Sequence, residues 1–411
     1  MGDWIALVGA MVVIATLANA PGVLLVAALT LGYGSLTSVW NRYGMRRVEY
    51  SRELSTGRAV AGDSVALDIT IWNRKRLPLP WITAQDRLSE ALTVRERAEM
   101  FPVEDQRRTL LLRNDWALTW YERVVRHFHL DDLPRGSYRF GPADLQVRDI
   151  LGRPAGDERL EATDTLTVAP AMAPLRHAER VMSTLGERRA PQSLTVDPAL
   201  FAGVRPFQPG DSLRQLHWRA TARLGATVSR RLEPARGRSV VLVVDVQTLD
   251  EPSWFGWDTD AFETLTVIAA SLARRLLADG ASVGVSAANF AGSPQRFAWL
   301  APRASLAQMP RVGEVLARIG PVPSAPLSAL LAWLTRRVPP GTTITLLSAR
   351  NPTPHLAALR RITSLGYGIE LITAGPDADG NALAARRARL HAMAGNVEPG
   401  WEKPDAVALV G

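Results

Sequence analysis

The chain has 411 residues, 47% of them hydrophobic, and contains no cysteine. This length and composition predict two or three folded domains, and the lack of cysteine excludes disulfides, thiolate metal sites and cysteine nucleophiles. The net charge of +8 comes mostly from arginines that are spread along the chain and rarely stand beside aromatic residues, so it does not favour nucleic acid as a partner.

Two uncharged apolar stretches stand at the N-terminus, residues 4–18 and residues 23–40. Each is close to the ~20 residues that cross the hydrocarbon core of a bilayer as a helix. The segment between them ends in Pro21 and Gly22, which is typical of a turn. Residues 1–40 are therefore expected to form a two-helix transmembrane hairpin.

The charges that flank this hairpin predict its sidedness. Arg42, Arg46 and Arg47 follow the second stretch, whereas the turn between the stretches has no basic residue. Because basic residues prefer the cytoplasmic side, we expect both termini and the bulk of the chain in the cytoplasm, anchored by two passes in a bacterial inner (plasma) membrane. A cleaved signal peptide is the alternative, but Asp3 stands where such a peptide carries positive charge.

The middle of the chain has the pattern of β-strands. Apolar side chains at every second position from Val65 to Ile71 indicate a half-buried strand. Similar runs occur near residues 124–130, 136–140 and 165–168. Short strands separated by turns favour an antiparallel β-sandwich over residues 49–170.

The most distinctive stretch lies in a connector that we assign to residues 171–238. Residues 203–231 read GVRPFQPGDSLRQLHWRATARLGATVSRR, and eight arginines stand against two acids from Arg205 to Arg238. Guanidinium groups suit planar anions, so this motif could bind phosphates or carboxylates. Docking of a protein partner or a tie between two domains is favoured over an anion site, since nothing catalytic accompanies the arginines. We assign seven residues to it as an interaction motif: Arg205, Asp211, Arg214, His217, Trp218, Arg219 and Arg223.

A short helix is expected within this arginine motif. Leu213, Leu216 and Ala220 recur at helical spacing after a Pro-Gly-Asp turn. Asp211 or Ser212 would then be the N-cap of the helix. His217 is interpreted as a packed or capping histidine rather than a general base, since no serine in a suitable setting accompanies it.

The last part of the chain, residues 239–411, alternates between strand-like and helix-like segments. Its first segment is a continuous apolar run, which is typical of a buried parallel strand. We expect strands at 239–245, 282–288, 296–300, 342–348 and 369–373, a helix from Asp260 with Glu263 in a capping box, a helix with Leu327, Leu330, Leu331 and Leu334, and a helix from Thr353 to Gly366. This alternation favours an open, doubly wound α/β sheet.

The stretch RPFQPGDSLRQLHWRATARLG resembles the signature of the domain-of-unknown-function-58 family, and YRFGPADLQVRDILG resembles the text that usually precedes it. The order of parts agrees with that family as well. The resemblance implies a membrane α-hairpin, an antiparallel β-sandwich and a doubly wound α/β domain of the von Willebrand factor A type, in all an α+β multidomain protein. It also implies a MoxR-type AAA+ ATPase as partner, often together with a transglutaminase-like membrane protein.

The metal position of von Willebrand factor A domains is degenerate in this sequence. Such domains place Asp-x-Ser-x-Ser after their first strand, and the oxygens of these side chains hold Mg²⁺. Here Asp245 is followed by Gln247 and Leu249 at the serine positions, and Arg350 stands near the place of a further aspartate. We therefore expect neither a metal nor another cofactor, and an ion pair between Asp245 and Arg350 instead.

The sequence therefore favours a membrane-anchored scaffold or adaptor rather than an enzyme. No Walker loop, dinucleotide fingerprint or catalytic triad is recognisable in the α/β region. The expected partners are the lipid bilayer, a MoxR-type AAA+ ATPase and a transglutaminase-like membrane protein, in envelope or stress-related assembly. The alternatives are a divalent-cation-dependent, adhesion-type binding module and a hydrolase that uses the arginine motif.

Overall fold

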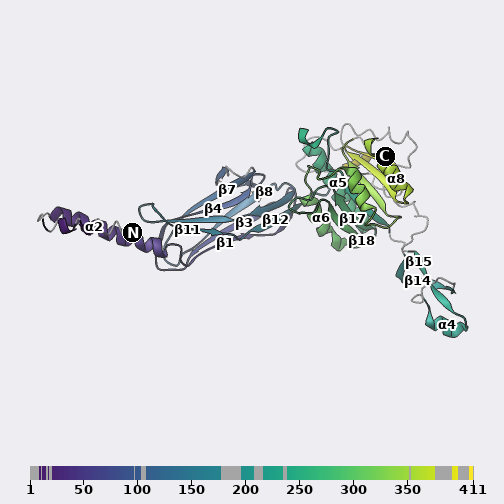
Figure 1. The fold of residues 1–411 in the computed structure, drawn as a ribbon, viewed down its shortest axis with the longest axis horizontal. Coiled ribbons are helices and arrows are strands. Elements are labelled where there is room, and N and C mark those ends of the chain that lie inside the picture. Colours follow the sequence, from purple (N-terminus) through teal and green to yellow (C-terminus); the bar gives the residue numbers. More distant parts are fainter. Residues whose placement is uncertain are drawn as a thin grey trace. The chain divides into compact units, whose positions relative to one another are not determined.

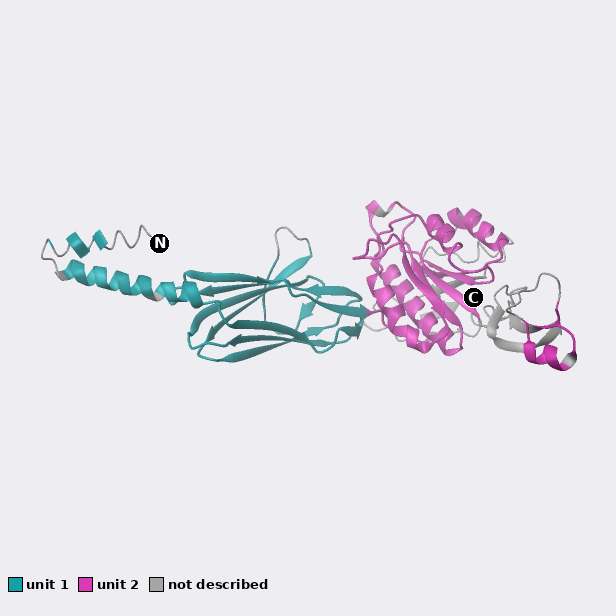
Figure 2. Ribbon diagram, turned by 60° about the horizontal axis from the view of Figure 1, so that its bottom comes forward, with its two compact units in different colours: residues 1–168 teal, residues 169–411 magenta. Residues whose placement is uncertain are grey.

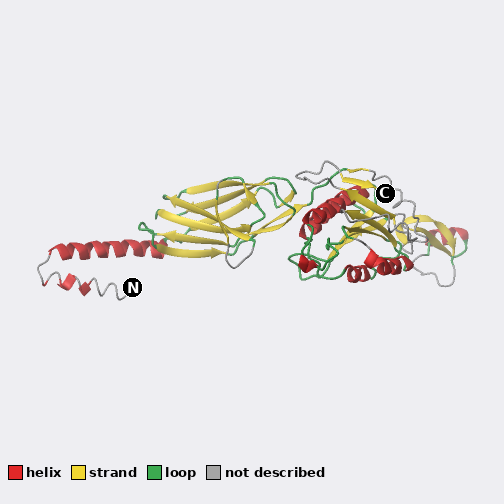
Figure 3. Cartoon of the chain, turned by 90° about the horizontal axis from the view of Figure 1, so that it is seen from above, coloured by secondary structure: helices red, strands yellow, loops and turns green. Residues whose placement is uncertain are grey.

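The chain divides into two compact units in the computed structural model, Met1–Val168 and Ala169–Gly411 (Figure 2). The structure describes residues 9–10, 12–14, 17, 21–96, 98–102, 108–176, 196–207, 216–234, 238–350, 353–374, 391–396 and 407–410. Beyond its N-terminal helical part the first unit is made of strands, whereas strands and helices alternate in the second (Figure 3). The chain is therefore a mixed α/β protein with several antiparallel sheets.

A long apolar helix, α2 (Pro21–Tyr43), opens the first unit. Pro21 suits the first turn of a helix, where a backbone N–H has no intrahelical partner. Leu25 and Leu29 are 62% and 65% exposed, so the described part of the chain leaves them uncovered. Among the described residues, Gly22–Tyr43 is the one segment long and apolar enough to cross a membrane.

The expected partner of α2, residues 4–18, lies mostly outside the described residues, and the two-helix hairpin remains a prediction. The helix α2 itself continues past the predicted end at Trp40 to Tyr43. The Trp40 side chain is only 7% exposed, and its Nε1 donates to the Pro78 oxygen at 3.0 Å. The last turns of α2 therefore pack on the strands of the first unit.

Three antiparallel sheets follow α2 (Figure 1). The first contains, in spatial order, β1 (Val48–Leu54), β3 (Val65–Asn73), β8 (Arg123–Asp131) and β5 (Thr93–Val94). The second contains β11 (Pro154–Leu160), β10 (Ala143–Arg148), β4 (Leu79–Ser89), β7 (Thr109–Leu118) and β6 (Glu99–Pro102), and the third β2 (Arg58–Val60), β12 (Asp164–Ala169) and β9 (Gly136–Phe140). The strands predicted in this region are confirmed as β3, β8, β9 and β12.

These three sheets share one hydrophobic core. In β3 the side chains of Val65, Leu67, Ile69 and Ile71 are at most 1% exposed, because they alternate with residues that face outward. The strands β4, β9, β10 and β12 contribute further buried side chains to the same cluster. Burial of one such side chain contributes about 1.5–3 kcal/mol, and the shared core thus holds the sheets together.

A buried ion-pair network also joins the three sheets. Arg52 of β1 donates from Nη1 to Asp86 of β4 at 2.5 Å and from Nε to Asp164 of β12 at 2.9 Å. The side chains of Arg52 and Asp86 are each 4% exposed. The Tyr50 hydroxyl donates to Asp86 at 2.8 Å, and burial, together with the negative charge of Asp86, raises the pKa of Tyr50. The buried Asp86 carboxylate therefore has a partner on each oxygen.

The second unit is built on an eight-stranded sheet. Its order is β13 (Leu175–Arg176), β22 (Val407–Val410), β21 (His391–Asn396), β20 (Gly368–Ala374), β19 (Thr343–Ser348), β16 (Ser239–Val244), β17 (Ser282–Ala287) and β18 (Ala298–Arg303). The strands from β21 to β17 pair in parallel, whereas β18 is antiparallel to β17. The helical segments are α5 (Thr259–Ala278), α6 (Met309–Arg318), α7 (Leu327–Leu334) and α8 (Leu356–Ser364), with the short turns η2 (Ser253–Phe255), η3 (Leu306–Gln308) and η4 (Thr353–His355).

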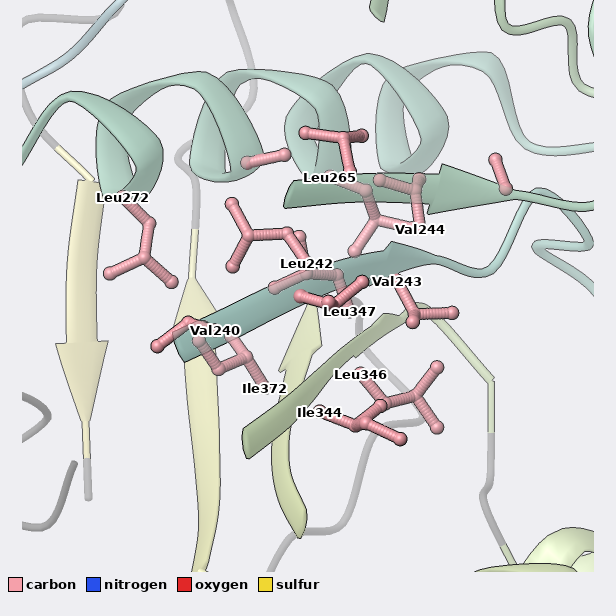
Figure 4. Close-up of a cluster of buried hydrophobic side chains, with 14 of the residues drawn as sticks. Val240, Leu242, Val243, Val244, Leu265, Leu272, Ile344, Leu346, Leu347 and Ile372 are labelled. Carbon is pink, nitrogen blue, oxygen red and sulfur yellow. The ribbon is translucent and has the colours of Figure 1, made fainter. Parts of the chain in front are cut away.

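The central strand β16 is covered on both faces. Each residue in Val240–Val244 is at most 1% exposed. Figure 4 shows Leu242 and Val244 on the side of the sheet that faces α5, and Val243 on the opposite side with Ile344 of β19. A strand that is apolar on both faces has to be covered on both, and the continuous apolar run of β16 predicted this burial.

Most elements predicted for this unit are confirmed, with three corrections. The helix expected from Thr353 begins as the turn η4 and becomes α-helical at Leu356. Strands occur where they were expected at 239–245, 282–288, 342–348 and 369–373. The helix expected from Asp260 begins one residue earlier, because the Asp258 side chain accepts the Ala261 N–H at 3.0 Å and is the N-cap. The edge strand is displaced from 296–300 to Ala298–Arg303.

Candidate functional site

A buried ion pair lies at the carboxyl ends of β16 and β19. Asp245 follows β16, and its backbone N–H donates to the Leu347 oxygen of β19 at 2.8 Å. Arg350 donates from Nε to Asp245 Oδ2 at 2.8 Å and from Nη2 to Oδ1 at 3.3 Å. The Ser348 hydroxyl donates to Oδ2 at 2.9 Å. The pair suggested by the sequence is thus present, with side chains that are 10% exposed for Arg350 and 4% for Asp245.

The residues around this pair do not fit a metal ion. Both oxygens of the Asp245 carboxylate already accept hydrogen bonds from a cation. Gln247 directs its side-chain amide into its own loop, where Nε2 donates to the oxygens of Leu249 and Glu251. Within the described ranges, no three His, Cys, Asp or Glu side chains come together in a way that could hold a metal. The guanidinium of Arg350 therefore occupies the place beside Asp245 that a cation would need.

His355 of η4 lies beside this ion pair. Its Nε2 is buried and has no hydrogen-bond partner in the part of the chain that the structure describes. Burial, followed by the positive charge of Arg350, lowers the pKa of His355, and the negative charge of Asp245 opposes that shift. Burial and the positive charge of Arg350 thus disfavour the protonated form of this imidazole.

Acidification is expected to destabilise the region around the carboxyl end of β19, where η4 carries His355. Because the pKa of His355 lies below its ordinary 6.5, the unfolded chain binds the proton more tightly than the folded one. The stabilisation is complete above pH 6.5 and is lost as the pH falls through the lowered pKa, at most about 1.4 kcal/mol per pH unit. Hydrogen exchange of the β19 amides in wild type and His355→Gln measures this difference, and an identical pH dependence in both proteins would refute it.

An exposed aromatic loop connects β16 to α5 beside the same ion pair. The loop is tied at its base, where the Asp258 N–H donates to Thr248 Oγ1 at 2.8 Å. Trp254 and Phe255 are 82% and 73% exposed, and Trp257 is 37% exposed. Sequence reasoning missed this feature, although three aromatic residues within four positions after a buried strand were a usable signal. Exposed aromatic side chains of this kind mark interaction surfaces.

The arginine motif forms a separate two-stranded hairpin with a short helix. β14 (Val196–Pro206) pairs antiparallel with β15 (Val228–Pro234), and α4 (Trp218–Leu224) lies between them in sequence. His217 is the N-cap of α4, since its Nδ1 accepts the Ala220 N–H at 3.1 Å. The capping role expected for His217 is confirmed, and the nitrogen that a general base would need is already in use.

The structure places the predicted motif residues only in part. Trp218 is 70% exposed, and Arg219 and Arg223 are exposed on the same helix. Arg205 lies in β14 opposite Ser229. Asp211 and Arg214 fall outside the described residues.

The helix predicted in this motif starts later than expected. It begins at Trp218 after His217, so Leu216 is not part of it. Leu216 instead forms a β-bridge with Ser229. The spacing of Leu216 and Ala220 resembled a helix because a single turn cannot be distinguished from a strand end by period alone.

A basic cavity of about 410 Å³ lies in the first unit. Four arginines and one acid are among its lining residues: Arg87, Arg108, Arg139, Arg159 and Glu161. Arg87 pairs with Asp144 at 2.9 Å, and Arg159 pairs with Glu161 at 2.9 Å. The sequence offered no signal for this cavity, because its arginines come from segments that are far apart in the sequence.

One known family matches the segment that contains the arginine hairpin and the strands β16, β17 and β18. Residues 203–312 match the family described as "Protein of unknown function DUF58". The chain thus contains a segment of the DUF58 family. The matched segment of this DUF58 protein includes the hairpin from Gly203, Asp245 and the aromatic loop, and it ends before Arg350. The family resemblance read from the motif is thereby confirmed.

One relative of this DUF58 protein is the uncharacterised protein YeaD of Bacillus subtilis (strain 168). The two are 24% identical over 252 residues, which cover 59% of this chain and 56% of YeaD. The chain thus spans little more than half the length of this relative.

Solved structures similar to parts of this DUF58 protein include a CARDB domain and a cohesin module. The CARDB domain of the PF1109 protein from Pyrococcus furiosus is 14% identical, with a TM-score of 0.20, and the match covers 29% of this chain and 93% of that domain. The cohesin module of a family 33 glycoside hydrolase from Clostridium perfringens is 9% identical, with a TM-score of 0.20, and covers 30% of this chain and 98% of the module. At these TM-scores the similarity assigns neither fold nor function.

Proposed function

We propose that this DUF58 protein is a membrane-anchored scaffold or adaptor whose α/β unit binds a protein partner, and that it is not an enzyme. The observation that carries this proposal is the enclosed Asp245–Arg350 pair. The carboxylate at the end of the central strand is bound by a guanidinium group and by the Ser348 hydroxyl. In that state it serves neither as a general base nor as a metal ligand.

The α/β unit is proposed to be a doubly wound domain of the von Willebrand factor A type. The strand order supports this, because β16 has β17 on one side and β19 on the other. From β16 the chain first adds β17 and β18 toward one edge of the sheet, and it then crosses to the other side of β16 and adds β19 and β20 toward the opposite edge. Binding sites of doubly wound sheets form beside such a reversal, at the carboxyl ends of the strands. Asp245 and Arg350 follow the two strands that flank this point.

The anchor is proposed to be a two-pass hairpin in the bacterial inner membrane, with both units in the cytoplasm. The uncovered apolar surface of α2 supports a membrane span. The cluster Arg42, Arg46 and Arg47 at the end of α2 supports the sidedness, since basic residues are retained on the cytoplasmic side. In this arrangement both units are on the cytoplasmic side, where a cytoplasmic partner can reach them.

The proposed contact surface is the aromatic loop that carries Trp254 and Phe255. Large aromatic side chains supply much of the binding energy in protein interfaces. The loop that carries them begins at Asp245, whose carboxylate is paired with Arg350 and not open to a metal, so the binding would be independent of divalent cations. The family resemblance makes a MoxR-type AAA+ ATPase the proposed partner, with a transglutaminase-like membrane protein as a further one, in envelope or stress-related assembly.

Co-purification tests this partnership. Full-length protein extracted from native membranes in detergent is expected to recover an AAA+ ATPase, identified by mass spectrometry, in an amount that depends on ATP. The double variant Trp254→Ser/Phe255→Ser is expected to lose most of that recovery, because each aromatic anchor is worth about 2 kcal/mol or more in an interface. Trp218→Ser, which removes an indole that is 70% exposed from the arginine hairpin, is the matched control.

One outcome contradicts the partnership, and two others move the contact to a different surface. Recovery of no AAA+ ATPase from native membranes contradicts the partnership. Equal recovery by wild type and the double variant leaves the partnership standing but assigns it to another surface. Loss in Trp218→Ser alone assigns it to the arginine hairpin.

A further inference from the structure

Strand register places three loops at the end of the first unit where α2 joins it. β1 begins opposite the end of β3, and β8 begins at that same end. The loops here are 74–78 between β3 and β4, 119–122 between β7 and β8, and 149–153 between β10 and β11. The contact of Trp40 with Pro78 places the last turns of α2 among them.

Two of these loops present large apolar side chains to solvent. Trp120 and Tyr121 in one loop are 67% and 58% exposed. Ile150 and Leu151 in the other are 48% and 64% exposed. We call these four residues the apolar rim. Adjacent exposed apolar residues of this size mark a surface that is covered in the working protein.

The loop with Ile150 and Leu151 runs alongside α2 rather than ending at its base. The guanidinium of Arg153 lies 5.2 Å from the centroid of the Tyr33 ring. Tyr33 precedes the helix end at Tyr43 by about 15 Å along the axis, at 1.5 Å per residue. The loop is therefore level with residues of α2 that belong to its membrane-spanning segment.

The backbone of this loop is suited to an apolar surrounding. Asp149 is 3% exposed, and its Oδ1 accepts the N–H groups of Leu151 and Arg153, both at 2.9 Å. The N–H of Gly152 donates to the Asp149 oxygen, and that of Asp149 to the Arg153 oxygen, again at 2.9 Å. Polar backbone groups can enter lipid only when they are satisfied internally, and most of those in this loop are.

The same end of the unit is strongly basic. Two glutamates lie there: Glu49 is half exposed and paired with Arg74 at 2.5 Å, and Glu122 accepts hydrogen bonds from the backbone N–H and the hydroxyl of Thr119. Exposed arginines at or next to this end are Arg42, Arg46, Arg47, Arg74, Arg76, Arg123 and Arg153. Guanidinium groups attract the anionic headgroups of a cytoplasmic leaflet and bind their phosphates. This charge matches a lipid surface.

From these observations we infer that the apolar rim is inserted into the interface of the bilayer, with the surrounding arginines on lipid phosphates. The first unit is then held on the membrane by its loops as well as by α2, in a fixed orientation and not on a free tether. The inference rests on the proposed membrane anchor, which α2 provides.

Spin labels on single cysteines test this arrangement. The chain has no native cysteine, so each label reports one position. Full-length Leu151→Cys and Trp120→Cys would be labelled in vesicles of phosphatidylethanolamine and phosphatidylglycerol. The collision of each label with oxygen, which dissolves in lipid, and with a nickel chelate, which remains in water, would then be measured.

Phe101→Cys is the matched control for the rim, and Leu29→Cys for the anchor. Phe101 is 46% exposed on β6 and pairs with Leu111, seven residues and roughly 24 Å from the Leu118 end of β7. Leu29 lies in α2 and reports the membrane span itself. Both rim labels are expected to collide several-fold less with the chelate than the Phe101→Cys label does, and to remain accessible to oxygen.

The possible outcomes are distinguishable. Rim labels as accessible to the chelate as Phe101→Cys, with Leu29→Cys protected, overturn the inference and leave the anchor intact. A Leu29→Cys label that is open to the chelate overturns the anchor, and the inference with it. Rim labels shielded from both oxygen and chelate indicate cover by protein, such as a second copy, and overturn insertion into lipid.

Discussion

Replacement of Arg52 by methionine is expected to destabilise the first unit by about 3–5 kcal/mol, because it removes one partner of a buried ion pair. The Asp86 side chain is 4% exposed, and without Arg52 only the Tyr50 hydroxyl would remain on its carboxylate. A buried charge without a counter-ion costs far more than an exposed one. Urea unfolding of the full chain in detergent measures the loss.

Two further variants show whether the Arg52 effect comes from the buried charge. Arg74→Met breaks the pair with Glu49, in which the side chains are 50% and 52% exposed, and is expected to cost less than about 1 kcal/mol. Arg52→Met/Asp86→Leu removes both buried charges and is expected to recover much of the stability. An Arg52→Met cost no larger than that of Arg74→Met would show that the network contributes little.

The second large effect is expected at the ion pair of the α/β unit. Asp245→Ala leaves a guanidinium that is 10% exposed without its partner, and Arg350→Ala leaves a carboxylate that is 4% exposed. Each is expected to cost about 3 kcal/mol, and the double variant less than the sum, with a coupling on the order of 2 kcal/mol. Additive costs in this double-mutant cycle would show that the two side chains act independently.

The same variants decide between a scaffold and a cation-dependent binding module. Because Arg350 and Ser348 engage the Asp245 carboxylate, wild type is expected to show no saturable binding of Mg²⁺ or Mn²⁺ at this position by calorimetric titration. Tight binding of either ion that Asp245→Ala abolishes would establish the adhesion-type alternative. The chelator-treated protein is then expected to lose its partner, whereas a scaffold closed by the ion pair retains it.

Strong local patterns allowed several elements to be predicted from the sequence. In the segment from Val65 to Ile71 and in β16, the order of apolar and polar residues along the chain directly indicates which side chains are buried. The helix α6 was missed because Pro310 and Gly313 interrupt its pattern. Gly313 belongs there for a tertiary reason, since a Cβ at this position would lie 2.9 Å from the Cβ of Ala169.

The ion pair of the candidate site could be predicted from the sequence, but the other residues around it could not. The missing serines after Asp245 and the arginine near the end of a later strand suggested an ion pair in place of a metal. The buried His355 and the exposed Trp254 and Phe255 were not foreseen, because exposure depends on which segments cover them. In the arginine motif, pairing of Leu216 with Ser229 displaced the expected helix start.

By itself, the sequence determined the apolar N-terminal segment, the change from strand pattern to alternating strands and helices, and the DUF58 motif, because each is encoded in neighbouring residues. Only the tertiary structure decided that Arg52 meets Asp86 and Asp164, and that the rim loops lie beside α2. Partners of this kind are brought together by strand register and sheet packing, which depend on the whole chain and leave no local pattern.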